Sequence, residues 1–121
     1  MGLDQTWITI EKDSTEEQVL YTHRKLHALE DFMASTWYAQ PENFGKVFNS
    51  ERLDITLEIL DELRKHIARN LFNLADTPLN RGFFAERHLS PEDEAEILEA
   101  VEEAETAIED RDATVYYTSS W

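Results

Sequence analysis

Two histidines and an aspartate are spaced as metal ligands could be on one face of a helix. His23 and His27 are four residues apart, and Asp31 follows after four more. Residues with this spacing share a helical face, and two histidines one turn apart can bind zinc. A closed site needs a third or fourth ligand, and only Glu30 lies near these three on the helix. A solvated polar stripe explains the same spacing, so we predict no metal site and no cofactor.

Nothing else in the sequence has the form of catalytic machinery. The chain contains no cysteine, and its three glycines are too scattered to build a phosphate-binding loop. The G-x-S-x-G, Walker and G-x-G-x-x-G patterns are absent. His66 and His88 are isolated, and no pair among the many carboxylates stands out as general acid and base. We therefore predict no catalytic residues and no enzymatic activity; a small metal-dependent enzyme using His23 and His27 is an alternative.

An acidic segment near the C-terminus is the strongest physical feature. Residues 92–109 carry nine acids and no base. As a helix the segment would be roughly 25 Å long, with about one charge per 3 Å against about one per 1.7 Å in duplex DNA. Like charges four residues apart destabilise a helix, which favours a functional reason, although a solvated face without a partner explains the pattern too.

Four of these acids, at positions i, i+4, i+7 and i+11, would form a continuous ridge along one side of the helix: Glu92, Glu96, Glu99 and Glu103. The residues that we predict to bind a partner are Glu92, Glu96, Glu99, Glu102, Glu103, Glu105, Glu109 and Asp110.

The overall charge restricts the classes of partner. The 121 residues include 26 acids and 11 bases, for a formal net charge of -15. Such a charge argues against direct binding to nucleic acid or to anionic lipid, since both would repel it, and it favours a basic partner surface. No apolar run approaches the ~20 residues that span a bilayer, and no signal-peptide pattern is present. We expect a cytoplasmic protein, although a generic acidic surface, adaptation to high salt or solubility alone would explain the charge.

Apolar periodicity predicts three helices. The first would run from about residue 15 to about residue 35, opened by the S-x-x-E capping pattern of Ser14 and Glu17. Its apolar stripe comprises Val19, Leu26, Leu29, Met33 and Trp37. The second would follow a cap at Ser50 and carry an apolar stripe to Leu74. The third would begin after Ser90. The stripe of the second helix comprises Leu53, Leu57, Leu60, Leu63, Ile67, Leu71 and Leu74. The inner stripe of the third comprises Ala95, Leu98, Val101, Ala104 or Glu105, and Ile108.

Two β-prone segments lie at the ends of the chain. Residues 7–10 and 114–118 are rich in β-branched and aromatic side chains, and residues 47–48 could form a very short strand. Val115 and Tyr117 would face one side of the last strand and Tyr116 the other. Neither end strand would persist alone, so we expect them to pair. The predicted fold is therefore α+β, with three helices packed on a small antiparallel sheet formed by the N- and C-terminal strands, and residues 1–121 are a single domain.

Several short motifs together resemble a family of small phage and prophage proteins. The chain reads M-G-L-D at 1–4, R-K at 24–25, G-F-F at 82–84 and Y-Y-T-S-S-W at 116–121. Members of the family begin M-G-L-D, carry G-F-F-F before the last helix and end in Y-x-S-S-W, in the same order and at similar spacing over nearly the whole chain. This chain differs by an aromatic displaced to Trp7 and by Ala85 in place of the third phenylalanine. The resemblance implies a phage or mobile-element origin, and it transfers no catalytic residues because the family has no established activity. In structural terms, Phe83 and Phe84 would fill the core and Trp121 would hold the last strand.

A small acidic phage protein without enzyme motifs suggests an inhibitor of a host defence protein, with an anti-CRISPR or anti-restriction role as the first hypothesis. Its expected partner is a host protein with a basic nucleic-acid-binding surface, which the acidic helix would occupy in place of DNA as a DNA mimic. No direct contact with nucleic acid or membrane is expected, and the location would be the host cytoplasm. The alternative is a structural or regulatory phage protein that self-associates through its second helix, which would make it a homodimer.

Overall fold

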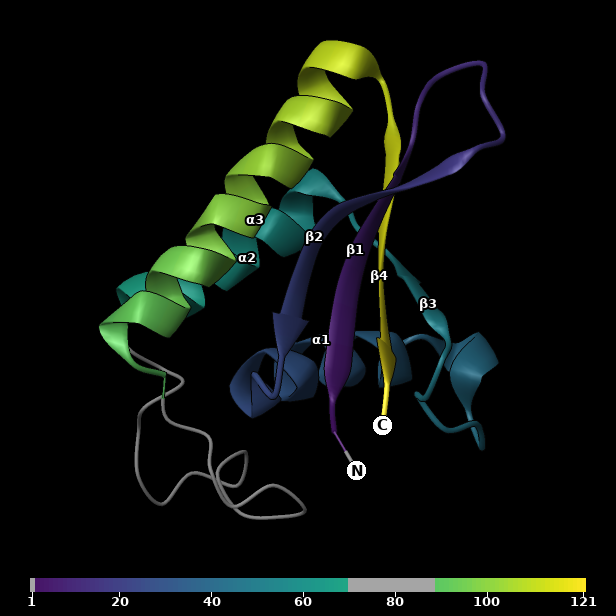
Figure 1. Ribbon diagram of the computed structural model, residues 1–121. Coiled ribbons are helices and arrows are strands. Elements are labelled where there is room, and N and C mark those ends of the chain that lie inside the picture. Colours follow the sequence, from purple (N-terminus) through teal and green to yellow (C-terminus); the bar gives the residue numbers. More distant parts are fainter. Residues whose placement is uncertain (1, 70–88) are drawn as a thin grey trace.

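In the computed structural model, helices pack on one face of a four-stranded antiparallel sheet (Figure 1). The structure describes residues 2–69 and 89–121, and within them it contains three α-helices. This arrangement confirms the predicted α+β class. In chain order the elements are β1 (Asp4–Ile10), β2 (Glu17–Arg24), α1 (His27–Tyr38), the short 3-10 helix η1 (Pro41–Asn43), β3 (Arg52–Asp54), α2 (Leu57–Ala68), α3 (Pro91–Arg111) and β4 (Thr114–Ser120).

The two ends of the chain form the centre of the sheet. The strand order β2-β1-β4-β3 places β1 beside β4. The pair runs antiparallel from Asp4 opposite Ser120 to Ile10 opposite Thr114, so the predicted pairing of the termini is confirmed. Strands β2 and β3, which the sequence analysis does not predict, complete the sheet on either side.

Alternation along the central strands determines which side chains enter the core. Trp7 on β1 and its partner Tyr117 on β4 are fully buried, with ring centroids 5.9 Å apart. They belong to a cluster that includes apolar side chains of all three described α-helices. Tyr116 lies on the opposite face, where the Arg52 guanidinium lies 4.5 Å from its ring centre. The predicted division of Tyr117 from Tyr116 is therefore confirmed.

Residues 17–24 form strand β2, so the predicted helix from residue 15 to residue 35 is wrong in its first half. Ser14 opens no helix: it lies in the turn between β1 and β2, where its hydroxyl accepts a hydrogen bond from the Glu16 backbone NH at 3.1 Å. Asp13 takes the left-handed conformation, with φ 63, that aspartate tolerates in turns. The β-branched and aromatic residues that follow pair with β1 instead, and Val19, assigned to the helical stripe, is 64% exposed.

Helix α1 begins at His27 and retains the second half of the predicted apolar stripe. Leu29, Met33 and Trp37 are buried along it. Tyr38 at its end remains half-exposed, and its hydroxyl accepts a hydrogen bond from the Phe48 backbone NH at 2.9 Å. Residues 47–48 form no strand, so that expectation is wrong.

Helix α2 begins at Leu57 rather than directly after Ser50. Thr56 is its N-cap, because its hydroxyl accepts a hydrogen bond from the Ile59 backbone NH at 3.2 Å. Ser50 is left-handed, with φ 60, whereas N-cap residues are extended. Leu53, assigned to the helical stripe, lies buried on β3.

Helix α3 begins where the sequence predicts. Ser90 accepts a hydrogen bond from the Asp93 backbone NH at 3.1 Å, and the Asp93 carboxylate accepts one from the Ser90 NH at 3.2 Å, which is a reciprocal capping box. The inner face is rotated from the predicted stripe, because Ala95 and Leu98 are exposed. The buried residues of α3 are Ile97, Ala100, Val101, Ala104 and Ala107. Small alanines at this face let α3 lie close to its neighbours.

Some predictions concern residues outside the described ranges. These are the end of the second apolar stripe at Leu71 and Leu74, the isolated His88, and the expected core plug of Phe83 and Phe84.

Candidate partner-binding surface on helix α3

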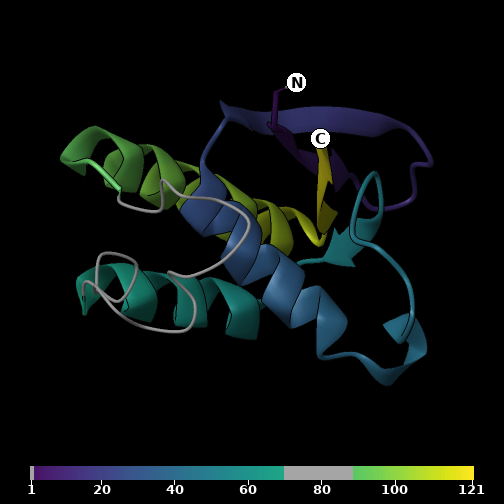
Figure 2. The same ribbon diagram turned by 90° about the horizontal axis from the view of Figure 1, so that it is seen from below.

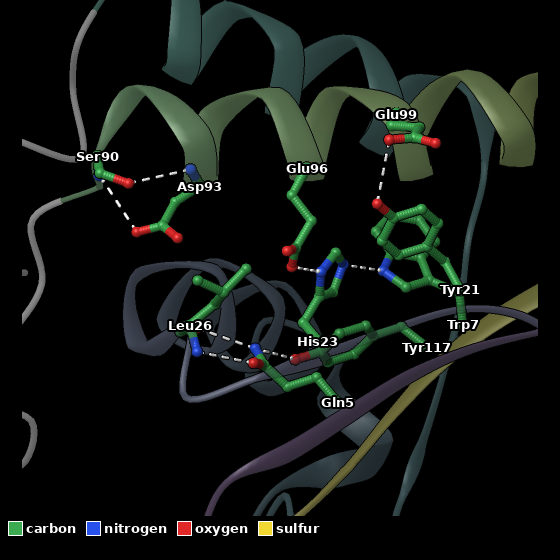
Figure 3. A network of polar contacts seen from close by, with 10 residues as sticks. All are labelled: Gln5, Trp7, Tyr21, His23, Leu26, Ser90, Asp93, Glu96, Glu99 and Tyr117. Carbon is green, nitrogen blue, oxygen red and sulfur yellow. Dashed lines mark hydrogen bonds and ion pairs between the residues drawn. The ribbon is translucent and has the colours of Figure 1, made fainter.

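Among the described residues, three acids of helix α3 form polar contacts that hold the helix against the rest of the protein. Two come from strand β2, where His23 contacts Glu96 and Tyr21 contacts Glu99 (Figure 3). The third comes from α2, where Arg64 binds Glu105. Each contact uses an acid that the sequence analysis assigns to partner binding.

His23 is neutral, and both of its ring nitrogens are occupied. The Trp7 indole can only donate, and its Nε1 lies 2.9 Å from His23 Nε2, which must accept. The proton is therefore on Nδ1, which donates to Glu96 Oε2 at 2.5 Å. Burial lowers the pKa of His23, against the opposing effect of Glu96. A ring with no exposed surface and no vacant nitrogen is unsuited to metal binding or proton transfer.

The predicted helical face of His23, His27 and Asp31 does not exist. His23 lies on β2, whereas His27 is the first residue of α1. No group of three ligating side chains gathers anywhere in residues 2–69 and 89–121.

The other two contacts to α3 lie nearer the surface. The Tyr21 hydroxyl donates to Glu99 Oε2 at 3.2 Å, and burial followed by this hydrogen bond raises the pKa of Tyr21. Arg64 donates to both carboxylate oxygens of Glu105, at 2.6 and 3.1 Å, and this hydrogen bonding lowers the pKa of Glu105. A bidentate arginine fixes geometry better than a single contact, so Arg64 sets the register of α2 on α3.

The remaining predicted acids are exposed. Within the described residues none of them forms an ion pair; the only base in the last turn of α3, Arg111, binds Glu11 of β1's C-terminal turn at 3.0 Å. This free acidic set comprises Glu92, Glu102, Glu103, Glu109 and Asp110.

The acidic surface continues from α3 onto the neighbouring helix α2. Glu58, Asp61 and Glu62 are exposed there. Lys65 neutralises part of this charge through contacts of 3.0 Å to Asp61 and 3.9 Å to Glu62. The outer surface of the two helices is therefore strongly negative.

Sequence reasoning overlooked a buried carboxylate on the opposite side of the core. Glu30 on α1 is 2% exposed, and it accepts hydrogen bonds from the Tyr117 hydroxyl at 2.7 Å and the Ser119 hydroxyl at 2.9 Å. Burial raises its pKa, and these hydrogen bonds oppose the rise. The available signal was spacing: Glu30 lies three residues before Met33 and seven before Trp37, on the buried face of α1.

The two kinds of acid on α3 should respond differently to truncation. We expect Glu96→Ala to lower the free energy of unfolding by about 1–3 kcal/mol, because it leaves the buried His23 NH without its acceptor. Glu103→Ala, one ridge position with no internal partner, should change it by no more than about 0.5 kcal/mol. Urea denaturation of both variants measures the difference. Equal effects would show that Glu96 is not structural.

Protonation of His23 should make stability fall in mild acid. Because the folded pKa is below the unfolded value of about 6.5, the unfolded chain binds more protons between the two values. The contribution of neutral His23 is therefore complete above the unfolded pKa and is lost as the pH falls toward the folded one. The free energy of unfolding of the wild type, minus that of His23→Gln, should shrink from pH 7.5 to pH 5.5. A difference that stays constant over this range would contradict the neutral assignment.

Comparison with known proteins leaves the family of this chain unassigned. No family model, curated protein or solved structure matched it. Among the described helices, none is long and apolar enough to cross a membrane.

Proposed function

We propose that the protein is an acidic inhibitor that binds a basic, nucleic-acid-binding surface of another protein and blocks access of DNA to it. The observation that carries the proposal is the free acidic set on α3: exposed carboxylates without ion-pair partners among the described residues. They occupy exposed positions of α3, and the neighbouring helix α2 carries exposed acids of its own.

The charge of the whole chain supports a basic partner. With a net charge of -15, the protein repels nucleic acid and attracts a surface that binds it. Complementary charge mainly accelerates encounter and excludes wrong partners. The acidic surface would thus direct the protein to a groove lined by lysine and arginine.

The position of the acids costs stability, which favours a functional explanation. Glu99 and Glu103 are one turn apart, and such like-charge pairs destabilise a helix by about 0.2–0.5 kcal/mol. Glu109 and Asp110 lie in the last turn of α3, where the helix dipole is already negative. Two of the ridge acids, Glu96 and Glu99, have a structural role through β2, whereas the free acidic set forms no ion pair among the described residues.

The resemblance to small phage proteins suggests the class of target. Host defence proteins that handle DNA, such as CRISPR effector complexes and restriction enzymes, must carry basic grooves. A phage-encoded protein acting in the host cytoplasm would protect phage DNA by occupying such a groove. We place an anti-CRISPR or anti-restriction activity first.

The free acidic set gives a direct test that leaves the contacts of Glu96, Glu99 and Glu105 intact. Bacteria with a defined CRISPR or restriction system would express the protein, and plating efficiency of a susceptible phage would be measured. The wild type should restore plating against at least one system. The quadruple variant Glu92→Gln, Glu102→Gln, Glu103→Gln and Glu109→Gln should restore it much less, because loss of steering lowers the association rate by roughly tenfold or more. Its fold should survive, since glutamine has nearly the helix propensity of glutamate.

A matched control removes the same number of charges elsewhere. Asp13→Asn, Glu16→Gln, Glu42→Gln and Glu51→Gln are all exposed positions outside α2 and α3, and asparagine tolerates the left-handed backbone of residue 13. This variant should protect phage as the wild type does. Equal activity of the α3 variant and the wild type would place the contact surface elsewhere, and no protection in any system would remove the proposal.

A further inference from the structure

Strand β2 has one edge that pairs with no other strand of the described fold. It is the outermost strand of the order β2-β1-β4-β3, and Figure 2 shows it along the rim of the sheet. At eight residues it is much longer than the other edge strand, β3. Such an edge presents unpaired NH and CO groups and is a template for another strand.

The charges along β2 are complementary to those of a second, antiparallel copy. The strand runs from Glu17 to Arg24. Glu16 immediately precedes it and Lys25 immediately follows it. A two-fold axis between residues 20 and 21 would place Glu17 opposite Arg24 of the second copy, with Glu16 and Lys25 just beyond the ends of the paired segments. By symmetry each pairing occurs twice. Opposite charges directly across an antiparallel ladder are favourable.

A β-bulge in β2 puts these charges on the same face of the sheet. Residues seven apart on a regular strand point to opposite faces. In β2 the register shifts between Trp7 and Ile8, which pair with Tyr21 and Val19 and leave Leu20 as the extra residue. Side chains on the two sides of the bulge can therefore share a face although they are an odd number of residues apart.

The pairing with β1 identifies that shared face. Glu17 lies opposite Ile10, and Arg24 lies opposite Asp4. Positions 4 and 10 are six residues apart on β1, so they share one face of the sheet. Trp7, three residues from each, points to the other face, where it is buried against the helices, so positions 4 and 10 lie on the face that the helices do not cover. Val19 and Thr22 lie on the same face, opposite Ile8 and Thr6.

We propose that the protein forms a symmetric dimer by antiparallel pairing of β2 with β2 of a second copy, which joins the two sheets into one. The choice of a second copy over an unrelated chain rests on the self-complementary order of charges, which is what an isologous two-fold contact requires. Val19, 64% exposed in the single chain, would be covered opposite Thr22 of the other copy. This contact differs from the dimer through the second helix that the apolar stripe suggested, and it does not depend on the proposed function.

Electrostatics gives this dimer a recognisable salt dependence. Each copy carries a net charge of -15, and Glu96 and Glu99 hold α3 beside β2. The acids on that side of α3, among them Glu92 and Glu103, would approach their counterparts across the two-fold axis. Salt screens such exposed charges over about 10 Å at 0.1 M. The dimer should therefore be weak at low ionic strength and tighter at moderate ionic strength.

Charge exchange tests the pairing in solution. Sedimentation velocity over a concentration series at moderate salt should show a dimer for the wild type. Glu17→Arg alone and Arg24→Glu alone should each be monomeric, because each places like charges opposite each other. An equimolar mixture of the two variants should form a heterodimer, because the introduced arginine meets the introduced glutamate and the two native side chains meet each other.

Matched controls separate pairing from net charge and from folding. Glu42→Arg and Lys46→Glu make the same charge changes at exposed positions in and after η1 and should dimerise as the wild type does. Thermal melts should show that all four variants remain folded. A wild type that is monomeric at every concentration and salt, or single variants that dimerise normally, or a mixture that stays monomeric, would overturn the proposal.

Discussion

The hydroxyl of Tyr117 is the point at which the sheet, helix α1 and both ends of the chain meet. It accepts a hydrogen bond from Gln5 Nε2 at 2.9 Å and donates one to Glu30 Oε1 at 2.7 Å. Gln5 in turn binds both backbone groups of Leu26 at 2.9 Å, immediately before α1. Buried polar groups are costly without partners, so each member of this network restricts the position of the next. The central strands and α1 are thereby fixed relative to one another.

Helix α3 is held against β2 and α2 by contacts other than those of Tyr117, and these contacts determine which acids of α3 remain exposed. The inner alanines allow close packing, while Glu96, Glu99 and Glu105 are used to bind β2 and α2. The free acidic set faces solvent. A helix whose inner face packs in the core, and whose flanks are held by polar contacts, can present charge on its remaining surface. This arrangement suits recognition of a basic surface by a rigid element.

The sequence predicted the elements whose signals are local. The capping pattern at Ser90, the β-rich ends and their pairing are all present in the structure. The prediction failed at residues 17–24, which form a strand paired with β1. Leu26, Leu29 and Met33 have helical spacing, and the predicted helix was extended from them back over this segment. Strand β3 was missed because three residues carry too little periodicity to separate from the helix that follows.

The sequence identifies the acids of α3, but not which of them bind other elements of the protein and which are left exposed. The acidity of residues 92–110 can be read directly from the sequence. The partners of Glu96 and Glu99 cannot, because they lie on β2, more than seventy residues earlier in the chain. Only the correct assignment of β2 as a strand brings His23 and Tyr21 beneath α3. Long-range pairing of this kind leaves no local mark, so no spacing within α3 distinguishes the structural acids from the free ones.

The coupling between Tyr117 and Glu30 is the most direct test of this account. A double-mutant cycle would compare Tyr117→Phe, Glu30→Met and the two together by urea denaturation. Each single change leaves a buried polar partner unsatisfied, whereas the double change removes both partners. The account predicts a coupling energy of about 1 kcal/mol or more, within the roughly 0.5–3 kcal/mol found for contacting residues. Single effects that simply add would contradict it, because the hydroxyl would then not be the interaction that ties β4 to α1.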